Sequence, residues 1–193
     1  MAARRARGGQ VRIIGGDWRG RKLPVLDAPG LRPTGDRVRE TLFNWLQFRI
    51  PGARVLDLFA GSGALGFEAA SRGACEVFML ERDARIANQL RENAERLGAD
   101  AVRVQNRDAL QWLECAKTSF DVIFLDPPFD AGLLTQVIES VRDNGIIAPA
   151  GCLYFEFDAK REPLAVEQGW RVLKRKMVGQ VGFGLLEPVA SAG

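Results

Sequence analysis

The feature that most constrains this chain is a regular alternation of short apolar runs with amphipathic stretches between residues 54 and 157. The apolar runs are 54–59, 76–81, 101–106, 121–126 and 152–157, and helical periodicity fills about 63–72, 84–97, 108–116 and 132–144. Strands this apolar, each followed by a helix, are typical of a parallel sheet that is covered on both faces. The chain is therefore predicted to be an α/β protein.

The two ends of the chain depart from this pattern. Residues 11–33 mix short apolar pieces with glycine, proline and charge, which favours a hairpin or an extended arm. Asp36 is expected to cap a helix that runs to about Arg49. Beyond Pro163, two strand-like runs have no helix between them, so we expect them to close the sheet as antiparallel strands.

The absence of histidine and of paired cysteines limits the catalytic and metal-binding chemistry that this chain can perform. The chain has no histidine, which excludes Ser-His-Asp, Cys-His and zinc-histidine sites. Its three cysteines, Cys75, Cys115 and Cys152, are far apart and form no CxxC pair. No export signal and no apolar run of membrane length is present, so we expect reduced thiols in a cytoplasmic protein with no membrane partner and no metal. Proton handling is left to carboxylates, backbone or water.

Positive charge is concentrated near the N-terminus. The first 50 residues hold eleven Lys/Arg and four Asp/Glu, a net charge of +7, whereas the whole chain carries +3 and the remainder therefore −4. Cationic side chains that neutralise phosphates release counterions, so a basic arm on a mildly acidic body favours a nucleic-acid partner. A flexible, solvated tail is the alternative that charge alone leaves open.

A glycine-rich turn follows the first apolar strand of the alternating region. Gly61, Gly63 and Gly66 let the backbone turn sharply and let a ligand approach closely, and their spacing also matches a dinucleotide fingerprint. Asp57, just before the turn, argues against NAD because a carboxylate repels a pyrophosphate. It suits S-adenosylmethionine, which has a sulfonium, an ammonium and no phosphate. The cofactor residues expected here are Asp57, Phe59, Ala60, Gly61, Ser62, Gly63, Glu81 and Arg82.

Two of these expectations concern hydrogen bonds to the cofactor. Glu81 ends the second strand, where its carboxylate is expected to accept hydrogen bonds from the ribose hydroxyls. Asp108 follows the third strand and has two interpretations. It accepts from the exocyclic amine of adenine, with Ala109 packed nearby, or it simply caps the next helix.

The most informative segment is the fourth strand and the loop after it, Asp126-Pro127-Pro128-Phe129. The strand delivers Asp126 to the carboxyl edge of the sheet, where open α/β folds bind their ligands. Asp126 is also expected to adjoin the cofactor. Two prolines fix the loop and leave carbonyls to point into the site, and Phe129 offers a flat face on which a base stacks.

This set suits an exocyclic amine as nucleophile. The Asp126 carboxylate and the Pro127 carbonyl each accept one N–H, which orients the nitrogen toward a sulfonium methyl and stabilises the positive charge that develops. Neither metal nor histidine is needed. The loop does not distinguish guanine N2 from adenine N6, because both present a conjugated amine beside a ring nitrogen.

Longer blocks resemble a known family. The segments 57–66 and 126–129 resemble the class I methyltransferase fold and its amino-methyltransferase branch, and 12–24, 31–34, 36–46 and 176–181 are similar to the bacterial RsmD family. The resemblance implies a Rossmann-like, seven-stranded, mostly parallel sheet with antiparallel C-terminal strands. It divides the chain into a basic N-terminal hairpin arm at 1–36 and a methyltransferase catalytic domain at 37–193.

The same resemblance implies methylation of a guanine N2 in 16S rRNA, in assembled or late-assembling small subunits, by a monomeric enzyme. It places Thr34 and Arg37 near the methionine end of the cofactor, although Arg37 is equally suited to a solvated helical turn. Residues expected to contact RNA are Arg12, Trp18, Arg19, Arg21, Lys22 and Arg32. Trp18 has a second interpretation, which is packing of the arm onto the domain. Phe183 departs from the family, whose members often have tyrosine there.

Two further functions stay open at this point. An amino-methyltransferase acting on DNA adenine or on a protein glutamine uses the same kind of loop. A non-catalytic RNA-binding or assembly factor retains such a fold without the chemistry. The intact set of Asp57, Gly61, Gly63, Glu81 and Asp126 argues against the assembly factor, and the basic arm argues against a protein substrate.

Overall fold

A computed structural model describes residues 9–26, 35–127, 131–158, 160 and 169–189, without the side chains of 131 and 132. The strands are β1 (Gly9–Arg12), β2 (Lys22–Val25), β3 (Arg54–Asp57), β4 (Glu76–Glu81), β5 (Val102–Asn106), β6 (Phe120–Leu125), β7 (Ile147–Asp158), β8 (Trp170–Val178) and β9 (Val181–Pro188). The helices are α1 (Asp36–Trp45), α2 (Ala64–Ser71), α3 (Ala84–Leu97), α4 (Ala109–Cys115) and α5 (Ala131–Asp143). Strands β1 and β2 form a separate antiparallel hairpin.

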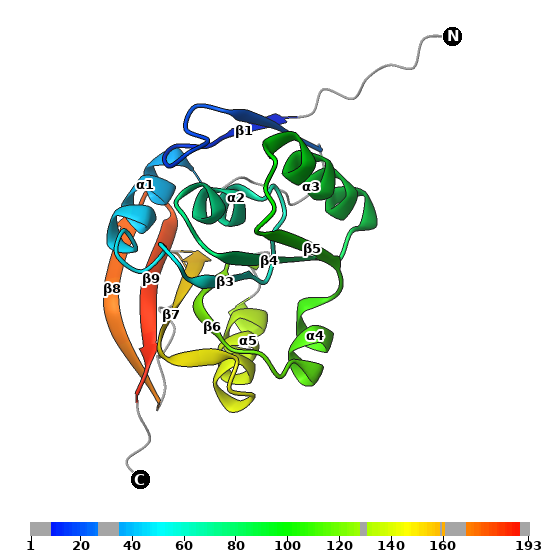
Figure 1. Cartoon of the computed structure of the whole chain (residues 1–193). Helices are drawn as coiled ribbons and strands as arrows, with labels where there is room; N and C mark the ends of the chain where they lie inside the picture. Colours follow the sequence, from blue (N-terminus) through cyan, green and yellow to red (C-terminus); the bar gives the residue numbers. More distant parts are fainter. Residues whose placement is uncertain (1–8, 27–34, 128–130, 159, 161–168, 190–193) are drawn as a thin grey trace.

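The other strands form a seven-stranded sheet in the order β5-β4-β3-β6-β7-β9-β8 (Figure 1). Strands β3 to β7 pair in parallel, while β9 pairs antiparallel with both β7 and β8. The chain winds outward from β3 to β5 and then returns to place β6 on the other side of β3. The predicted mostly parallel sheet with antiparallel C-terminal strands is confirmed, and its topological switch point lies between β3 and β6.

Helices cover both faces of the sheet. In Figure 1, α1, α2 and α3 lie on one side and α4 and α5 on the other. Each face has its own buried cluster: residues of α1, α2 and α3 pack against Val55, Val77 and Val122 on one side, and residues of α4 and α5 pack against Leu56 and Ile123 on the other. Successive side chains of a strand point to opposite faces of the sheet, so neighbours such as Val55 and Leu56 belong to different clusters.

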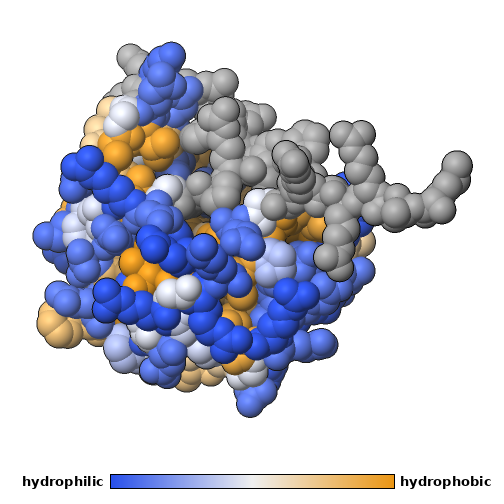
Figure 2. Space-filling model, turned by 90° about the horizontal axis from the view of Figure 1, so that it is seen from above, coloured by the Kyte–Doolittle hydropathy of each residue, from blue (hydrophilic) through white to orange (hydrophobic). Residues whose placement is uncertain are grey.

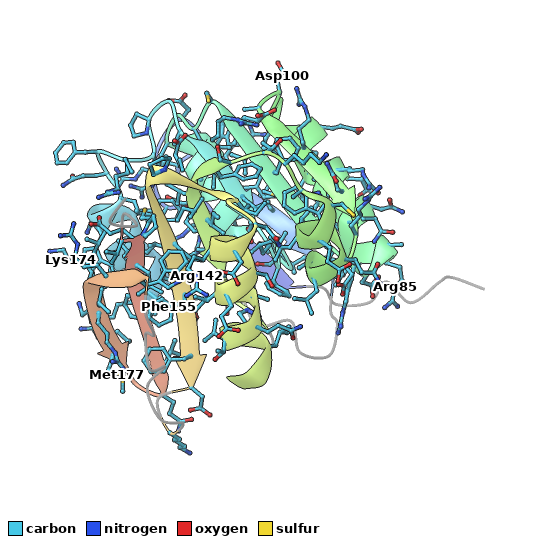
Figure 3. All side chains as sticks on the ribbon, turned by 90° about the horizontal axis from the view of Figure 1, so that it is seen from below. Arg85, Asp100, Arg142, Phe155, Lys174 and Met177 are labelled. Carbon is cyan, nitrogen blue, oxygen red and sulfur yellow. The ribbon has the colours of Figure 1, made fainter. Side chains whose placement is uncertain are left out.

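Strand β8, at one edge of the sheet, exposes most of its side chains, unlike the strands that are covered by helices. Figure 3 shows Lys174 and Met177 projecting from β8 at the border of the sheet, with Phe155 inside the molecule near α5, which carries Arg142. Met177 is 52% exposed and Phe155 only 2%. Lysine and arginine on an outer strand oppose pairing with another chain, which limits aggregation at that edge.

Three predicted boundaries were wrong. Helix α1 ends at Trp45 rather than Arg49, because the chain turns there and buries Ile50, which is 1% exposed. Gly35 rather than Asp36 occupies the cap position, and the Asp36 carboxylate instead accepts a hydrogen bond at 2.6 Å from Arg39. Strand β7 begins at Ile147, earlier than expected. Ile147 pairs with Phe120 of β6, and after a register shift Cys152 pairs with Val122.

The hairpin is packed into the domain. Val11, Ile13, Leu23 and Val25 are all buried and belong to the cluster of α1, α2 and α3. Gly16 touches α2 so closely, with φ of 74°, that a Cβ there would lie 1.8 Å from the Ser71 carbonyl oxygen. The boundary at residue 36 stays a prediction, but 9–26 share a hydrophobic core with the rest of the described chain.

A buried ionic network fixes this packing. The Glu68 carboxylate of α2, 0% exposed, accepts hydrogen bonds from the backbone N–H groups of Ile14 and Gly15, both at 2.8 Å. It also accepts from Arg72 Nε at 2.7 Å. Arg39 of α1, 1% exposed, lies 3.8 Å from the same carboxylate and donates to the Arg12 carbonyl at 2.9 Å. One carboxylate therefore joins hairpin, α1 and α2.

The described residues contain no helix that is both long enough and apolar enough to cross a membrane. All three cysteines are free thiols, with Cys75 and Cys115 exposed and Cys152 buried. Burial raises the pKa of Cys152 to about 11, so this thiol stays protonated at neutral pH.

Candidate active site

Polar side chains gather where the parallel strands end. Asp57 closes β3, Glu81 closes β4 and Asn106 closes β5, while Asp126 directly follows β6. Because parallel strands present their carboxyl ends at one edge, these side chains come from adjacent positions around the switch point between β3 and β6. The fold therefore brings these predicted residues to one edge of the sheet, and ligand binding at this edge stays a prediction.

Asp57 is the most deeply buried of these acids, at 2% exposure. Its Oδ2 accepts a hydrogen bond from Gly66 N in the first turn of α2 at 3.2 Å. Burial raises the pKa of Asp57 to about 7, and the neighbouring Glu81 charge acts in the same direction. A carboxyl group in this state gains its charge most readily when a cation comes close.

The turn after β3 brings backbone rather than side chains toward this acid. Gly63 has φ of 75° and caps α2, and a Cβ there would lie 2.6 Å from both Leu90 and Phe67. Ala60 is tied back to β4 by a 2.9 Å hydrogen bond from its N–H to the Leu80 carbonyl. Phe59 and Gly61 are half-buried, whereas Ser62 is buried. The turn is thereby held tightly against both strands.

Glu81 organises the next loop. Its Oε2 accepts from Gly61 N at 3.0 Å and its Oε1 from Asp83 N at 2.8 Å, so the carboxylate bridges the turns after β3 and β4. Asn106 supports this loop by donating to the carbonyls of Glu81 and Arg82 at 2.8 and 2.9 Å. Arg82 itself is exposed.

Asp108 is a helix cap. Its Oδ1 accepts from Leu110 N at 3.0 Å and from Gln111 N at 3.2 Å at the start of α4. Ala109 is buried behind it. Of the two interpretations drawn from the sequence, the capping role is the one that the structure shows, and contact with adenine stays a prediction.

The loop after β6 is described only at its start. Asp126 is half-buried and Pro127 is buried, whereas Pro128 and Phe129 lie outside the described residues. The last paired residues of β6 and β7 are Leu125 and Phe155, so Asp126 stands beside Glu156. Stacking on Phe129 stays a prediction.

Sequence reasoning missed Tyr154 and Glu156 of β7. The Tyr154 hydroxyl donates to Glu156 Oε1 at 2.6 Å, and the two residues are 0% and 6% exposed. Burial, followed by the charges of Glu156 and Asp126, raises the pKa of Tyr154 well above its ordinary value. The signal in the sequence was an acid inside an otherwise apolar strand.

Phe183 of β9 pairs with Glu156 in the sheet and is fully buried. Its ring lies 5.3 Å from that of Trp45 and 6.3 Å from that of Tyr154. The residue that departs from the family pattern thus fills an aromatic wall behind Tyr154, where a ring without a hydroxyl packs without a polar partner.

The residues predicted to bind RNA lie mainly on the hairpin. Arg12, Arg19, Arg21 and Lys22 are exposed, although Arg12 also pairs with Asp36 at 3.3 Å and Arg21 donates to the Arg96 carbonyl at 2.9 Å. Figure 2, seen from the hairpin side, shows a mostly hydrophilic surface with small apolar patches. Four cations on one hairpin form a surface suited to phosphates.

The Trp18 side chain is half-buried against the cluster of α1, α2 and α3, and the backbone N–H of Trp18 donates to Ser71 Oγ at 2.9 Å. The structure therefore shows the packing interpretation of Trp18, and contact with RNA stays a prediction. Arg37 is exposed in the first turn of α1. Thr34 and Arg32 lie outside the described residues, so the proposed methionine-carboxylate contacts stay predictions. No metal-binding group of three or more Cys, Asp or Glu occurs in the described segments.

Comparison with known proteins identifies the family. The profile of the family described as conserved hypothetical protein 95 matches residues 11–187. Over 179 residues the chain is 48% identical to ribosomal RNA small subunit methyltransferase D of Escherichia coli K12, covering 93% of this chain and 90% of that protein.

Solved structures agree with this assignment. A putative methyltransferase, yhhF, of Escherichia coli matches with a TM-score of 0.87 and 43% identity, covering 95% of this chain and 100% of that one. The T. thermophilus 16S rRNA N2 G1207 methyltransferase RsmC, solved with AdoMet and guanosine, matches with a TM-score of 0.69 and 26% identity, covering 95% of this chain and 50% of that one. The chain therefore belongs to the conserved hypothetical protein 95 family, the RsmD family that its N-terminal motifs resemble.

Proposed function

We propose that this protein transfers a methyl group from S-adenosylmethionine to the exocyclic N2 of a guanine in 16S rRNA of the small ribosomal subunit. The observation that carries the proposal is the row of acids Asp57, Glu81 and Asp126 at the ends of three neighbouring strands. The activity of the relative named ribosomal RNA small subunit methyltransferase D supports the rRNA substrate, and that of the 16S rRNA N2 G1207 methyltransferase RsmC supports guanine N2.

The described residues fit S-adenosylmethionine better than a dinucleotide. A buried carboxyl with a pKa of about 7 becomes ionised beside a cation, and it would repel a pyrophosphate. Glu81 holds its loop through backbone N–H groups, and a carboxylate has further lone pairs to accept ribose hydroxyls. When bound, the cofactor supplies an electrophilic methyl group on sulfur.

The residues of the chain then act on the base. The Asp126 carboxylate and the Pro127 carbonyl accept the two N–H bonds of the amine and aim its nitrogen at the methyl carbon. The new N–C bond forms as the carbon–sulfur bond breaks, and one amine proton passes to Asp126 or to water. Asp126 stabilises the positive charge on nitrogen while it develops, which is the main catalytic contribution expected of it.

Docking on RNA is assigned to the exposed cations of the hairpin. Arg12, Arg19, Arg21 and Lys22 project from an element that is packed rigidly onto α1 and α2. A rigid hairpin holds the RNA phosphates at a set distance from the carboxyl edge. Arg32, outside the described residues, is proposed to add to the same surface.

The test is transfer of labelled methyl groups to small subunits, naked 16S rRNA and DNA, followed by nucleoside analysis. N2-methylguanosine from small subunits or 16S rRNA is the expected product. N6-methyladenosine would move the protein to the adenine methyltransferases, and label on none of the three, together with measurable cofactor binding, would favour an assembly factor.

A further inference from the structure

A second acid stands beside the catalytic loop. In the parallel pair of β6 and β7, Phe124 is opposite Tyr154 and Leu125 is opposite Phe155, so the next residues, Asp126 and Glu156, are neighbours. Adjacent strands lie about 4.8 Å apart. Phe124 and Tyr154 belong to the cluster of α1, α2 and α3, and side chains alternate along a strand, so Asp126 and Glu156 project on that same face.

The Glu156 carboxylate is held in a fixed orientation. It is 6% exposed, and burying a carboxylate is costly unless its oxygens accept hydrogen bonds. The Tyr154 hydroxyl donates to Oε1 at 2.6 Å and is itself locked between Phe124 and Phe183. Because burial raises the pKa of Tyr154 well above its ordinary value, this hydroxyl stays a donor across the neutral range.

We propose that Glu156 is the residue that selects guanine, its carboxylate accepting the N1–H of the base whose N2 amine is held by Asp126 and the Pro127 carbonyl. This role rests on the proposed function and adds to it the contact that the catalytic loop lacks. Two acceptors side by side match the N1–H and N2–H donors on the Watson–Crick edge of guanine.

The same carboxylate excludes adenine. The N1 of adenine carries a lone pair, so a carboxylate in front of it brings two acceptors together with no proton between them. Sites built to bond an N–H reject an analogue that lacks it by factors of up to about 10⁴, because the buried acceptor loses its partner. Discrimination between guanine and adenine thus arises from Glu156 on β7. The amine-binding residues Asp126 and Pro127 do not distinguish the two bases by themselves.

Tyr154 is a positioning residue in this scheme. Its hydroxyl touches Glu156 and not the base, and it fixes which carboxylate lone pairs face the Watson–Crick edge. Removing the hydroxyl is therefore expected to weaken base selection in the same direction as changing Glu156, but by a smaller factor.

The experiment compares guanine with 2-aminopurine at the nucleotide that the labelling experiment maps as methylated, in reconstituted small subunits. 2-Aminopurine keeps the exocyclic amine at C2 but has no proton on N1. Single-turnover rates are expected to favour guanine in the wild-type protein by about 10² or more. Glu156→Gln presents an amide N–H that pairs with the bare N1, so the guanine preference is expected to fall at least ten-fold.

The controls separate selection from folding and from the proposed function. Glu76→Gln changes a carboxylate at the opposite end of β4, where it pairs with Arg54, and is expected to leave the preference unchanged. Cofactor affinity of each variant reports an intact fold. A Glu156→Gln variant that slows both substrates equally overturns the role of Glu156.

If Glu156→Gln forms no measurable product, Tyr154→Phe decides the matter. A reduced guanine preference in that variant supports the proposal, and an unchanged preference contradicts it. Failure of the wild-type protein to methylate guanine N2 in small subunits or 16S rRNA would instead count against the proposed function itself.

Discussion

The two halves of the carboxyl edge are built differently. In the half formed by β3, β4 and β5, acids accept hydrogen bonds mainly from backbone: Asp57 from Gly66, Glu81 from Gly61 and Asp83. In the half formed by β6 and β7, Glu156 accepts from a side chain, the hydroxyl of Tyr154. We call these the cofactor half and the base half.

The difference matches what each half has to bind. Backbone donors are fixed by the fold, so they hold the acids of the cofactor half in one orientation. A constant orientation suits a ligand that does not change, such as a shared cofactor. Side-chain donors are changed by a single substitution without altering the sheet, so a fold of this kind alters its substrate by changing the base half alone. Function lies in such sites rather than in the fold.

The largest expected effect concerns the base half alone. Asp126→Ala removes the carboxylate that orients the amine, so the rate of methyl transfer is expected to fall by about 10³ or more. Cofactor affinity, measured by calorimetry, is expected to stay within a few-fold of wild type. Retained turnover would show that Asp126 is not the group that stabilises the transition state.

Glu68→Gln is expected to destabilise the packing of the hairpin, α1 and α2 rather than either half of the carboxyl edge. The amide removes the Glu68 charge that lies 3.8 Å from the buried Arg39 guanidinium, which keeps its ion pair with Asp36, and it weakens two hairpin contacts, at a cost of about 3 kcal/mol in the free energy of unfolding. Denaturant unfolding measures this loss. Glu95→Gln, an exposed acid of α3, is the matched control and is expected to change stability by less than about 0.5 kcal/mol.

Asp57→Asn tests the cofactor half. Loss of the charge is expected to weaken S-adenosylmethionine binding about 10- to 100-fold, since a charge-assisted contact contributes about 1.5–3 kcal/mol. In the wild-type protein, affinity is expected to weaken as the pH falls below about 7, where the Asp57 carboxyl takes up a proton. Titrations of cofactor binding from pH 5 to 9 compare the two proteins, and a flat wild-type profile would contradict the role of Asp57.

The same group predicts a stability effect of opposite sign. Its folded-state pKa lies above the unfolded value of 3.8, so the folded protein holds the proton more tightly and loses stability as the pH rises from about 4 to about 7. Without cofactor, Asp57→Asn is therefore expected to unfold at a higher temperature than wild type at pH 8. The ionised Asp57 carboxylate is therefore expected to lower the stability of the cofactor-free protein while it strengthens cofactor binding.

The smallest effects are expected on the hairpin. Arg19→Ala and Lys22→Ala change exposed cations that touch neither half, so each is expected to weaken small-subunit binding by a few-fold and to reduce the salt slope by about one. Lys174→Ala, on the far edge of the sheet, is the matched control. Deleting residues 1–30 is a poorer test, because it would also remove Val11, Ile13, Leu23 and Val25 from the core.

Local patterns made the cofactor half predictable. Asp57, the glycine turn and Glu81 lie within one strand–helix–strand unit, so spacing along the chain indicates proximity in space. The base half depends on contacts between distant segments. Glu156 meets Asp126 only through the register of β6 and β7, and Phe183 is placed opposite Glu156 by the pairing of β7 with β9. The hydrogen bonds from the hairpin backbone to Glu68 could not be predicted either. Nearly every residue has a backbone N–H, so no residue type marks Ile14 and Gly15 as the donors.

The position of β9 has a consequence for the order in which the site assembles. This strand, near the end of the chain, inserts between β7 and β8 and brings Phe183 against Tyr154. On the ribosome that makes the protein, residues 54–106 emerge before residues 181–188, so the cofactor half is expected to form before the base half. Hydrogen exchange during refolding is expected to protect β3 and β4 before β7. A nascent chain would then bind cofactor before it can select a base.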